Sequence, residues 1–146
     1  MNISIDLTTS TVEEGIGYWL RRAQQTVLHD FSETFVPYDL RPAEFSLLML
    51  LANQPGIKQS DAAEILGIQR ANFVALVDAL QQRGLAERRK PDSDRRVQSL
   101  FLTRQGSDFV VETSGKWRQH ESRMISRLGS MEDRDQLVEL LTRLAY

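Results

Sequence analysis

Residues 60–80, SDAAEILGIQRANFVALVDAL, have the pattern of two short helices joined by a tight turn. Ala63 is small at a point where the two helices must approach closely, and Gly67 allows the chain to turn between them. Ile68, Phe73 and Leu76 supply apolar side chains for a shared core. The stretch therefore predicts a helix-turn-helix, although an ordinary helical hairpin would share much of this pattern.

The second of these helices, expected at about residues 70–83, begins with polar side chains. In a DNA-binding helix-turn-helix, this end of the second helix lies in the major groove. There an Arg can bridge the acceptors of guanine, and Asn or Gln can pair with adenine. We therefore expect Gln69, Arg70 and Asn72 to contact bases.

A basic hairpin is expected directly after the helix-turn-helix. Residues 85–90 and 97–102 are short segments on either side of the charged, turn-forming stretch 91–94. Residues 83–104 contain seven Lys and Arg against three Asp and Glu, a net charge of +4, whereas the whole chain carries −2. Such a local basic segment can attract DNA phosphates, although a charge cluster alone is often only solvated surface.

Amphipathic helices flank this central part on both sides. Residues 12–36 carry apolar side chains at spacings of three and four, and Pro37 interrupts the pattern. Pro42 opens a second helix, and Ser60 is expected to cap the helix at 61–66. After the hairpin, caps at Thr103 and Ser130 predict a long helix and a final one, whose apolar residues are Leu137, Leu140, Leu141 and Leu144.

Composition bounds the class of protein. The 146 residues are 41% hydrophobic and 26% charged, which suits one globular unit spanning residues 1–146. The sequence contains no apolar run long enough for a membrane span, and its first residues lack the pattern of a secretory signal. We therefore expect a cytoplasmic protein with no membrane partner. The absence of cysteine excludes thiolate nucleophiles, thiolate metal sites and sulfur-based redox switches.

An enzyme is not expected. The chain has two histidines, no cysteine and no glycine loop that could cradle a phosphate, so no catalytic site and no cofactor are predicted. His29, Asp30 and Glu33 could form a metal-binding face on the first helix. One histidine with two carboxylates is more often the wet side of an amphipathic helix, so no metal site is predicted either.

The stretch RGLAERRKPDSDRRVQSLFLTRQG at residues 83–106, following a helix-turn-helix, resembles the MarR family of transcriptional regulators. The resemblance rests on Gly84 with Leu85 at the exit of the second helix, on the Asp-x-Arg of the hairpin, and on the Leu-Thr-x-x-Gly entry to the next helix. It implies a mainly α fold with a small β-hairpin wing. The winged helix-turn-helix would occupy residues 42–103, and dimerisation helices would occupy residues 12–36 and 104–146.

The resemblance also implies roles for the residues of the wing. Arg96, supported by Arg95, would enter a minor groove, where a narrow groove favours an inserted arginine. Asp94 would hold the wing through a salt bridge. Arg88, Arg89 and Lys90 would touch phosphates or nothing. Val74 and Ala75 stand where family members commonly have Thr and Arg, so Val74 is expected to contact a thymine methyl group.

A protein of this family would act as a cytoplasmic homodimer on double-stranded operator DNA, as a repressor released by a small aromatic ligand. GYWLRRAQ at 17–24 and GIQRANFVALVDAL at 67–80 are also similar to regulators of hydroxycinnamate catabolism that respond to aromatic acyl-CoA thioesters. Candidate partners for CoA phosphates are Arg21, Arg22 and Arg41. Candidates to surround the aromatic group are Trp19, Tyr38 and Phe45.

Two alternatives remain open at this point. The arginines could be solvated or touch DNA, and aromatic side chains at helical spacing, including Met49 and Trp117 beside them, are more often plain core. A winged helix can also serve as a protein-interaction module that binds no DNA. Such a module would need no basic wing, and a salt-dependent gel shift would separate the two functions.

Overall fold

The computed structural model describes residues 8–146. Two short 3₁₀ helices, η1 and η2, accompany six α-helices and three strands in this part of the chain. In chain order the elements are η1 (Val12–Glu14), α1 (Ile16–Phe35), η2 (Val36–Tyr38), α2 (Pro42–Asn53), β1 (Ile57–Lys58), α3 (Gln59–Leu66), α4 (Arg70–Gln82), β2 (Ala86–Arg89), β3 (Ser99–Leu102), α5 (Arg104–Leu128) and α6 (Met131–Ala145).

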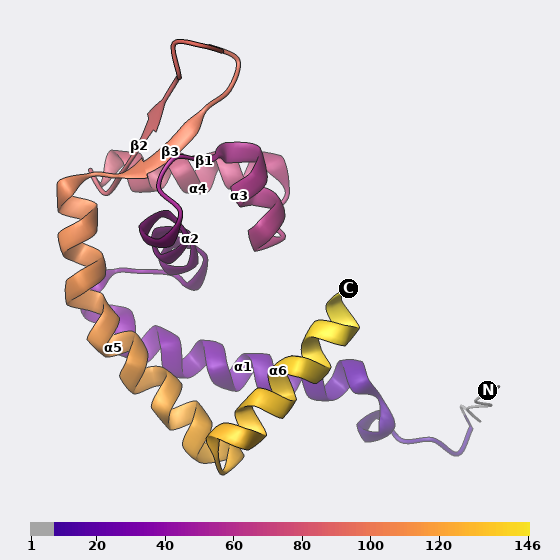
Figure 1. Cartoon of the computed structure of the whole chain (residues 1–146). Helices are drawn as coiled ribbons and strands as arrows, with labels where there is room; N and C mark the ends of the chain where they lie inside the picture. The colour runs from indigo at the N-terminus through magenta and orange to yellow at the C-terminus, as the bar shows by residue number, and fades with distance from the viewer. Residues whose placement is uncertain (1–7) are drawn as a thin grey trace.

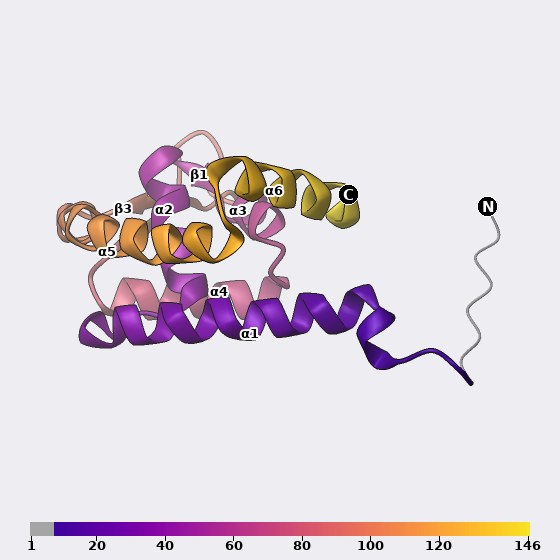
Figure 2. The same ribbon diagram turned by 90° about the horizontal axis from the view of Figure 1, so that it is seen from below.

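The predicted mainly α fold with a winged helix-turn-helix is confirmed. In Figure 1, α2, α3, α4 and the sheet form one cluster, from which the wing between β2 and β3 projects. From this cluster α5 descends to pack against α1, and α6 turns back from the far end of α5 at Gly129. Seen from below, α1 continues well beyond the cluster (Figure 2).

The sheet has three strands where a two-stranded hairpin was expected. Its order is β1–β3–β2, all antiparallel, with Ile57 opposite Leu100 and Ala86 opposite Leu102. The extra strand, β1, is two residues long, and so short a segment leaves no periodicity in the sequence. The two expected strands exist, and each is shorter than expected by two residues.

Most of the expected helix starts are confirmed. Pro42 occupies the first turn of α2, Thr103 Oγ1 accepts a hydrogen bond from Gly106 N at 2.9 Å, and Ser130 Oγ accepts one from Asp133 N at 3.1 Å. The expected cap at Ser60 is wrong. Helix α3 begins at Gln59, two residues before the expected start, and the Gln59 N–H donates to Gln98 O at 2.9 Å, so a backbone carbonyl next to β3 replaces a side-chain cap.

The first long helix also begins later than expected. Residues 12–14 form a 3₁₀ turn, and Gly15 is extended with φ −82° and ψ 133°, so α1 starts at Ile16. The end at Phe35 agrees with the interruption expected at Pro37. Apolar residues at spacings of three and four can therefore continue across a short 3₁₀ segment, so the spacing does not mark where the α-helix begins.

The hydrophobic core joins the end of α1 to the winged domain. Phe31 and Phe35 stack at 4.3 Å between ring centroids, and both rings lie against Phe45 of α2. Deeper in the domain, Phe73 of α4 and Leu100 of β3 are almost fully buried. The core thereby fixes the winged domain to one end of α1.

Large apolar side chains remain exposed elsewhere. On the first turns of α1, Ile16 is 66% and Trp19 57% exposed, and α6 has no buried residue at all. The exposed apolar residues of α6 are Met131, Leu137, Val138, Leu140, Leu141 and Leu144. Within residues 8–146, no helix is long and apolar enough to cross a membrane.

Candidate nucleic-acid interface

The second helix of the helix-turn-helix, α4, is anchored by one face and free on the other. Phe73, Leu76 and Val77 are buried against the core. The turn before α4 depends on Gly67, which has φ +63°, a conformation that favours glycine. As a result, the polar start of the helix projects outward, and Gln69, Arg70 and Asn72 are all exposed.

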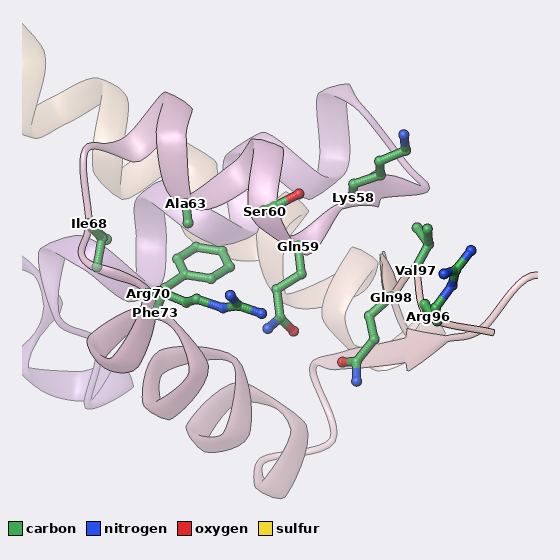
Figure 3. A pocket seen from close by; sticks show the side chains of 10 residues that line it. All are labelled: Lys58, Gln59, Ser60, Ala63, Ile68, Arg70, Phe73, Arg96, Val97 and Gln98. Carbon is green, nitrogen blue, oxygen red and sulfur yellow. The ribbon is translucent and has the colours of Figure 1, made fainter. Parts of the chain in front are cut away.

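A groove of about 560 Å³ runs between α4 and the root of the wing. Arg70 lines it from the start of α4 and Arg96 lines it from the wing, with Gln59 and Gln98 between them (Figure 3). Its other lining residues are Lys58, Ser60, Ala63, Ile68, Phe73 and Val97. Two arginines from different elements therefore border one concave surface, which suits a polyanion.

Asp94 organises the turn of the wing. Its Oδ1 accepts hydrogen bonds from Arg96 N at 3.0 Å and from Arg96 Nε at 3.3 Å. Its own backbone N–H donates to Pro91 O at 3.2 Å, and its carbonyl accepts from Val97 N at 3.2 Å. The expected salt bridge is thus formed with Arg96 itself, whose side chain is 94% exposed.

The Arg96 side chain is exposed and therefore available to contact DNA. Such a contact would break only the weak surface pair with Asp94. Arg95, its neighbour at the tip of the wing, is exposed as well.

Arg88 differs from the expectation that it touches phosphates or nothing. Its side chain is only 19% exposed, because it lies against α4. Arg88 Nη1 lies 2.7 Å from Asp78 Oδ1, and Nη2 donates to the carbonyl of Val74 at 3.2 Å. Arg88 therefore makes these contacts inside the winged domain.

Arg89 and Lys90 point away from this network. Arg89 pairs with Glu87 on the same strand, and its guanidinium carbon lies 4.1 Å from the centre of the Phe101 ring. Lys90 is exposed at the start of the wing turn. Val74, expected at a thymine methyl group, is partly buried on α4.

The motif residues around the wing meet in space. The Thr103 hydroxyl donates to Gly84 O at 2.6 Å, and Thr103 N donates to Leu85 O at 3.1 Å. A Cβ added at Gly106 would lie 1.9 Å from that same Leu85 oxygen. The Gly-Leu exit from α4 and the Leu-Thr-x-x-Gly entry to α5 therefore form one tight junction, which closes the wing at its base.

The aromatic side chains expected to surround a ligand do not lie close together within one protomer. Tyr38 packs against Phe35 and Phe109, and Phe45 is 3% exposed beneath Trp117. Trp19 lies sixteen residues before Phe35 on α1, about 24 Å along the helix axis. Phe45 is therefore a core residue, and Trp19 is remote from the other two aromatic side chains.

The candidate arginines are divided in the same way. Arg21 and Arg22 are exposed on the first half of α1. Arg41 lies at the start of α2, where its Nη2 is 2.9 Å from Oε1 of the buried Glu44. Arg41 follows Tyr38 by three residues in the chain, and two of its side-chain donors, Nε and Nη2, are bonded to Glu44.

Two polar clusters went unnoticed in the sequence. Arg83, at the end of α4, donates to the carbonyls of Asp39 and Tyr38 at 2.6 and 2.8 Å, which ties α4 to the connection between α1 and α2. Between α1 and α5, the buried His120 ring places Nδ1 2.6 Å from Asp30 Oδ2. Each pair joins residues more than forty positions apart, so local spacing carried no signal for either.

The Arg123 guanidinium donates to both Asp30 oxygens at 2.9 Å. These hydrogen bonds, assisted by the one from His120, lower the pKa of Asp30 to about 2 despite partial burial. Asp30 therefore stabilises the packing of α1 against α5. Its neighbours His29 and Glu33 form an exposed pair at 3.4 Å, and residues 8–146 contain no cluster of side chains suited to a metal.

Comparison with known proteins gives consistent results. The sequence profile of the MarR family matches residues 38–97. The structure of the transcriptional repressor CouR bound to a 23-mer DNA duplex is 40% identical, covers 97% of this chain and 100% of its own, and superposes with a TM-score of 0.88. The structure of CouR bound to p-coumaroyl-CoA is 38% identical over 96% of this chain and 98% of its own, with a TM-score of 0.84.

A regulatory protein assigned to the hcr operon of Thauera aromatica is 28% identical over 140 residues, 95% of this chain and 84% of its own. The repressor MprA of Escherichia coli strain K12 is 29% identical over 123 residues, 83% of this chain and 69% of its own. These relatives are named as regulators of transcription rather than as enzymes.

Proposed function

The chain belongs to the MarR family of DNA-binding transcriptional regulators. From this we propose that it is a homodimeric repressor that binds its operator with α4 and the wing. The observation that carries the proposal is the groove bordered by Arg70 on one side and Arg96 on the other (Figure 3). Helix α4 would enter the major groove and the wing the adjacent minor groove.

Different residues of this interface would contact different parts of the DNA. Gln69, Arg70 and Asn72 would read base edges, because they are exposed at the projecting end of α4. Arg96, with Arg95 beside it, would enter the minor groove, and Lys90 is placed to meet a phosphate. Few polar groups follow on α4, so DNA shape and the wing would carry much of the specificity.

A second copy of the chain is the natural cover for the apolar residues of α1 and α6. These side chains would otherwise leave a large apolar patch in water. A two-fold axis through residues 12–36 and 104–146 would place the two α4 helices about 34 Å apart, one turn of DNA. The operator should then be roughly palindromic, with residues 42–103 of each copy on one half-site.

The proposal is tested by selecting bound fragments from genomic DNA with the purified full-length protein. We expect recovery of short, roughly palindromic sites, and binding that weakens as salt rises. If no fragment is enriched and no gel shift appears at low salt, the alternative of a winged-helix module for protein contacts would be favoured.

The effector is proposed from the relative that binds p-coumaroyl-CoA. In this chain Tyr38 and Arg41 lie where α1, α2 and α5 meet, beside the Arg83 link to α4, so a ligand there could alter the placement of α4. Trp19 is about 20 Å or more away along α1. A free aromatic acid is much shorter than that separation, whereas a CoA thioester is long enough to reach along the helix towards Arg21 and Arg22.

Calorimetry with p-coumaroyl-CoA, feruloyl-CoA and the free acids tests this assignment. We expect heat of binding and release of operator DNA with a thioester, and neither with a free acid. A ligand shifts the equilibrium only by its preference for the state that does not bind DNA, so both readouts are needed. If no thioester binds, this effector class is excluded, and the DNA-binding proposal is unaffected.

A further inference from the structure

Arg88 of β2 makes an unusually complete set of contacts for a residue on a basic strand. Its Nε donates to Gln59 Oε1 at 2.9 Å, and its Nη1 donates to Gln81 Oε1 at 2.8 Å and lies 2.7 Å from Asp78 Oδ1. Its Nη2 donates to Val74 O at 3.2 Å. One guanidinium therefore joins three elements of the winged domain, namely α3, α4 and β2.

These contacts connect the two parts that would hold DNA. Val74, Asp78 and Gln81 follow one another along a single side of α4, at spacings of four and three. On the strand side, Arg88 is opposite Leu100, one position before the Arg89–Ser99 pair at which the sheet ends and the wing turn begins. The Arg88 side chain thus fixes the root of the wing to the middle of α4.

We propose that Arg88 is a positioning residue for DNA recognition, which holds the wing at a fixed distance and angle from α4 without touching DNA. The inference rests on the proposed DNA-binding function. A helix in the major groove and an arginine in the minor groove bind together only if their separation matches the DNA. The planar fork of Arg suits this task, because it supplies several donors in fixed directions.

A direct phosphate contact by Arg88 is the competing role, and comparison of the salt dependence of Arg88→Ala with that of Asp78→Ala separates the two. Each phosphate contact contributes about 0.9 to the slope of log affinity against log salt. If Arg88 binds phosphate, Arg88→Ala lowers the slope of a dimer by about 2. If Arg88 positions the wing, affinity for the operator falls by tenfold or more, and Asp78→Ala, which keeps the Arg88 charge, changes both the affinity and the slope as Arg88→Ala does.

Asp78 gives a test in which even the sign differs. Its side chain is about half exposed, so removing its negative charge should by charge alone strengthen binding to DNA. The positioning role predicts the opposite, because Asp78→Ala releases Arg88 from α4. The double variant should then bind about as weakly as the weaker single variant, since both substitutions break the same link.

The experiment uses the full-length protein with the selected operator fragment and a shuffled duplex of equal length, at several salt concentrations. The variants are Arg88→Ala, Arg88→Lys, Asp78→Ala, the double Ala variant and, as a charge-matched control on the exposed side of α5, Arg118→Ala. Thermal unfolding checks that each variant is folded. If the Arg88→Ala variant does not fold, the test uses Arg88→Lys and Asp78→Ala, because each of these leaves most of the side-chain packing in place.

We expect both single Ala variants to lose operator affinity tenfold or more, with a smaller loss on the shuffled duplex and the same salt slope in both variants. Arg88→Lys should restore only part, because Lys cannot make the forked contacts. Full rescue by Lys, a slope that falls in Arg88→Ala but not in Asp78→Ala, or tighter binding by Asp78→Ala would overturn the proposal, as would unchanged affinity in both Ala variants. Failure of the unaltered protein to bind any DNA would instead refute the proposed function on which the inference rests.

Discussion

Replacing Arg96 by Ala should separate DNA binding from folding. The Arg96 side chain is 94% exposed, and its side-chain partner is Asp94 at 3.3 Å. Its removal should therefore change the free energy of unfolding by less than about 0.5 kcal/mol. In the complex, one good groove contact is worth roughly 1–3 kcal/mol. Giving up the surface pair with Asp94 costs at most about 1 kcal/mol of this.

The net loss is then about 1–2 kcal/mol for each wing. At about 1.4 kcal/mol for each tenfold change, a dimer with two wings should bind its operator some tens to a thousand times more weakly. Fluorescence anisotropy with a labelled operator fragment measures this loss, with Arg118→Ala as the charge-matched control. Asp94→Ala should weaken binding less, through a disordered turn. Superimposable curves for Arg96→Ala and the unaltered protein would remove the wing from the mechanism.

Three further predictions concern the scaffold. Gly106→Ala should lower stability by about 1–3 kcal/mol or more in thermal unfolding, because its Cβ would meet the Leu85 oxygen at 1.9 Å, whereas Gly115→Ala in the same helix has open space and should be neutral or stabilising. Because the pKa of Asp30 is lowered to about 2, its hydrogen bonds should add about 2 kcal/mol to the free energy of unfolding above pH 4, and this contribution should be lost as the pH falls towards 2. In urea unfolding, the Asp30→Asn variant should lack this pH dependence. Leu140→Glu on α6 should give monomers in analytical ultracentrifugation at micromolar concentration, and dimers there would contradict the assigned interface.

The features that could be predicted from the sequence are those encoded over a few neighbouring residues. The turn at Gly67 requires φ +63°, and the cap at Thr103 requires a hydroxyl three residues before an N–H, so each leaves a local pattern. The hairpin was expected for the same reason. Strand β1 was missed because its two residues form a strand only by pairing with β3, some forty residues later.

The candidate site shows the same division. Exposure of Arg70 and Asn72 followed from the helical period, which places Phe73 and Leu76 on the opposite face. The position of Arg88 depends on partners in α3 and α4, so the composition of its own strand suggested a free cation instead. Trp19 was grouped with Tyr38 by residue type, although a helix of twenty residues keeps them apart.

Operator recognition by a dimer is tested most directly by titrating the selected operator, and a shuffled duplex of equal length, with the purified protein at about physiological salt. A dimer that reads this DNA should saturate the operator at two chains per site, with an affinity for the operator that exceeds that for the shuffled duplex by about a thousandfold or more. Both affinities should fall as salt rises. Equal affinity for the two duplexes, or saturation at one chain per site, would contradict the claim that a dimer reads this DNA with paired α4 helices and wings.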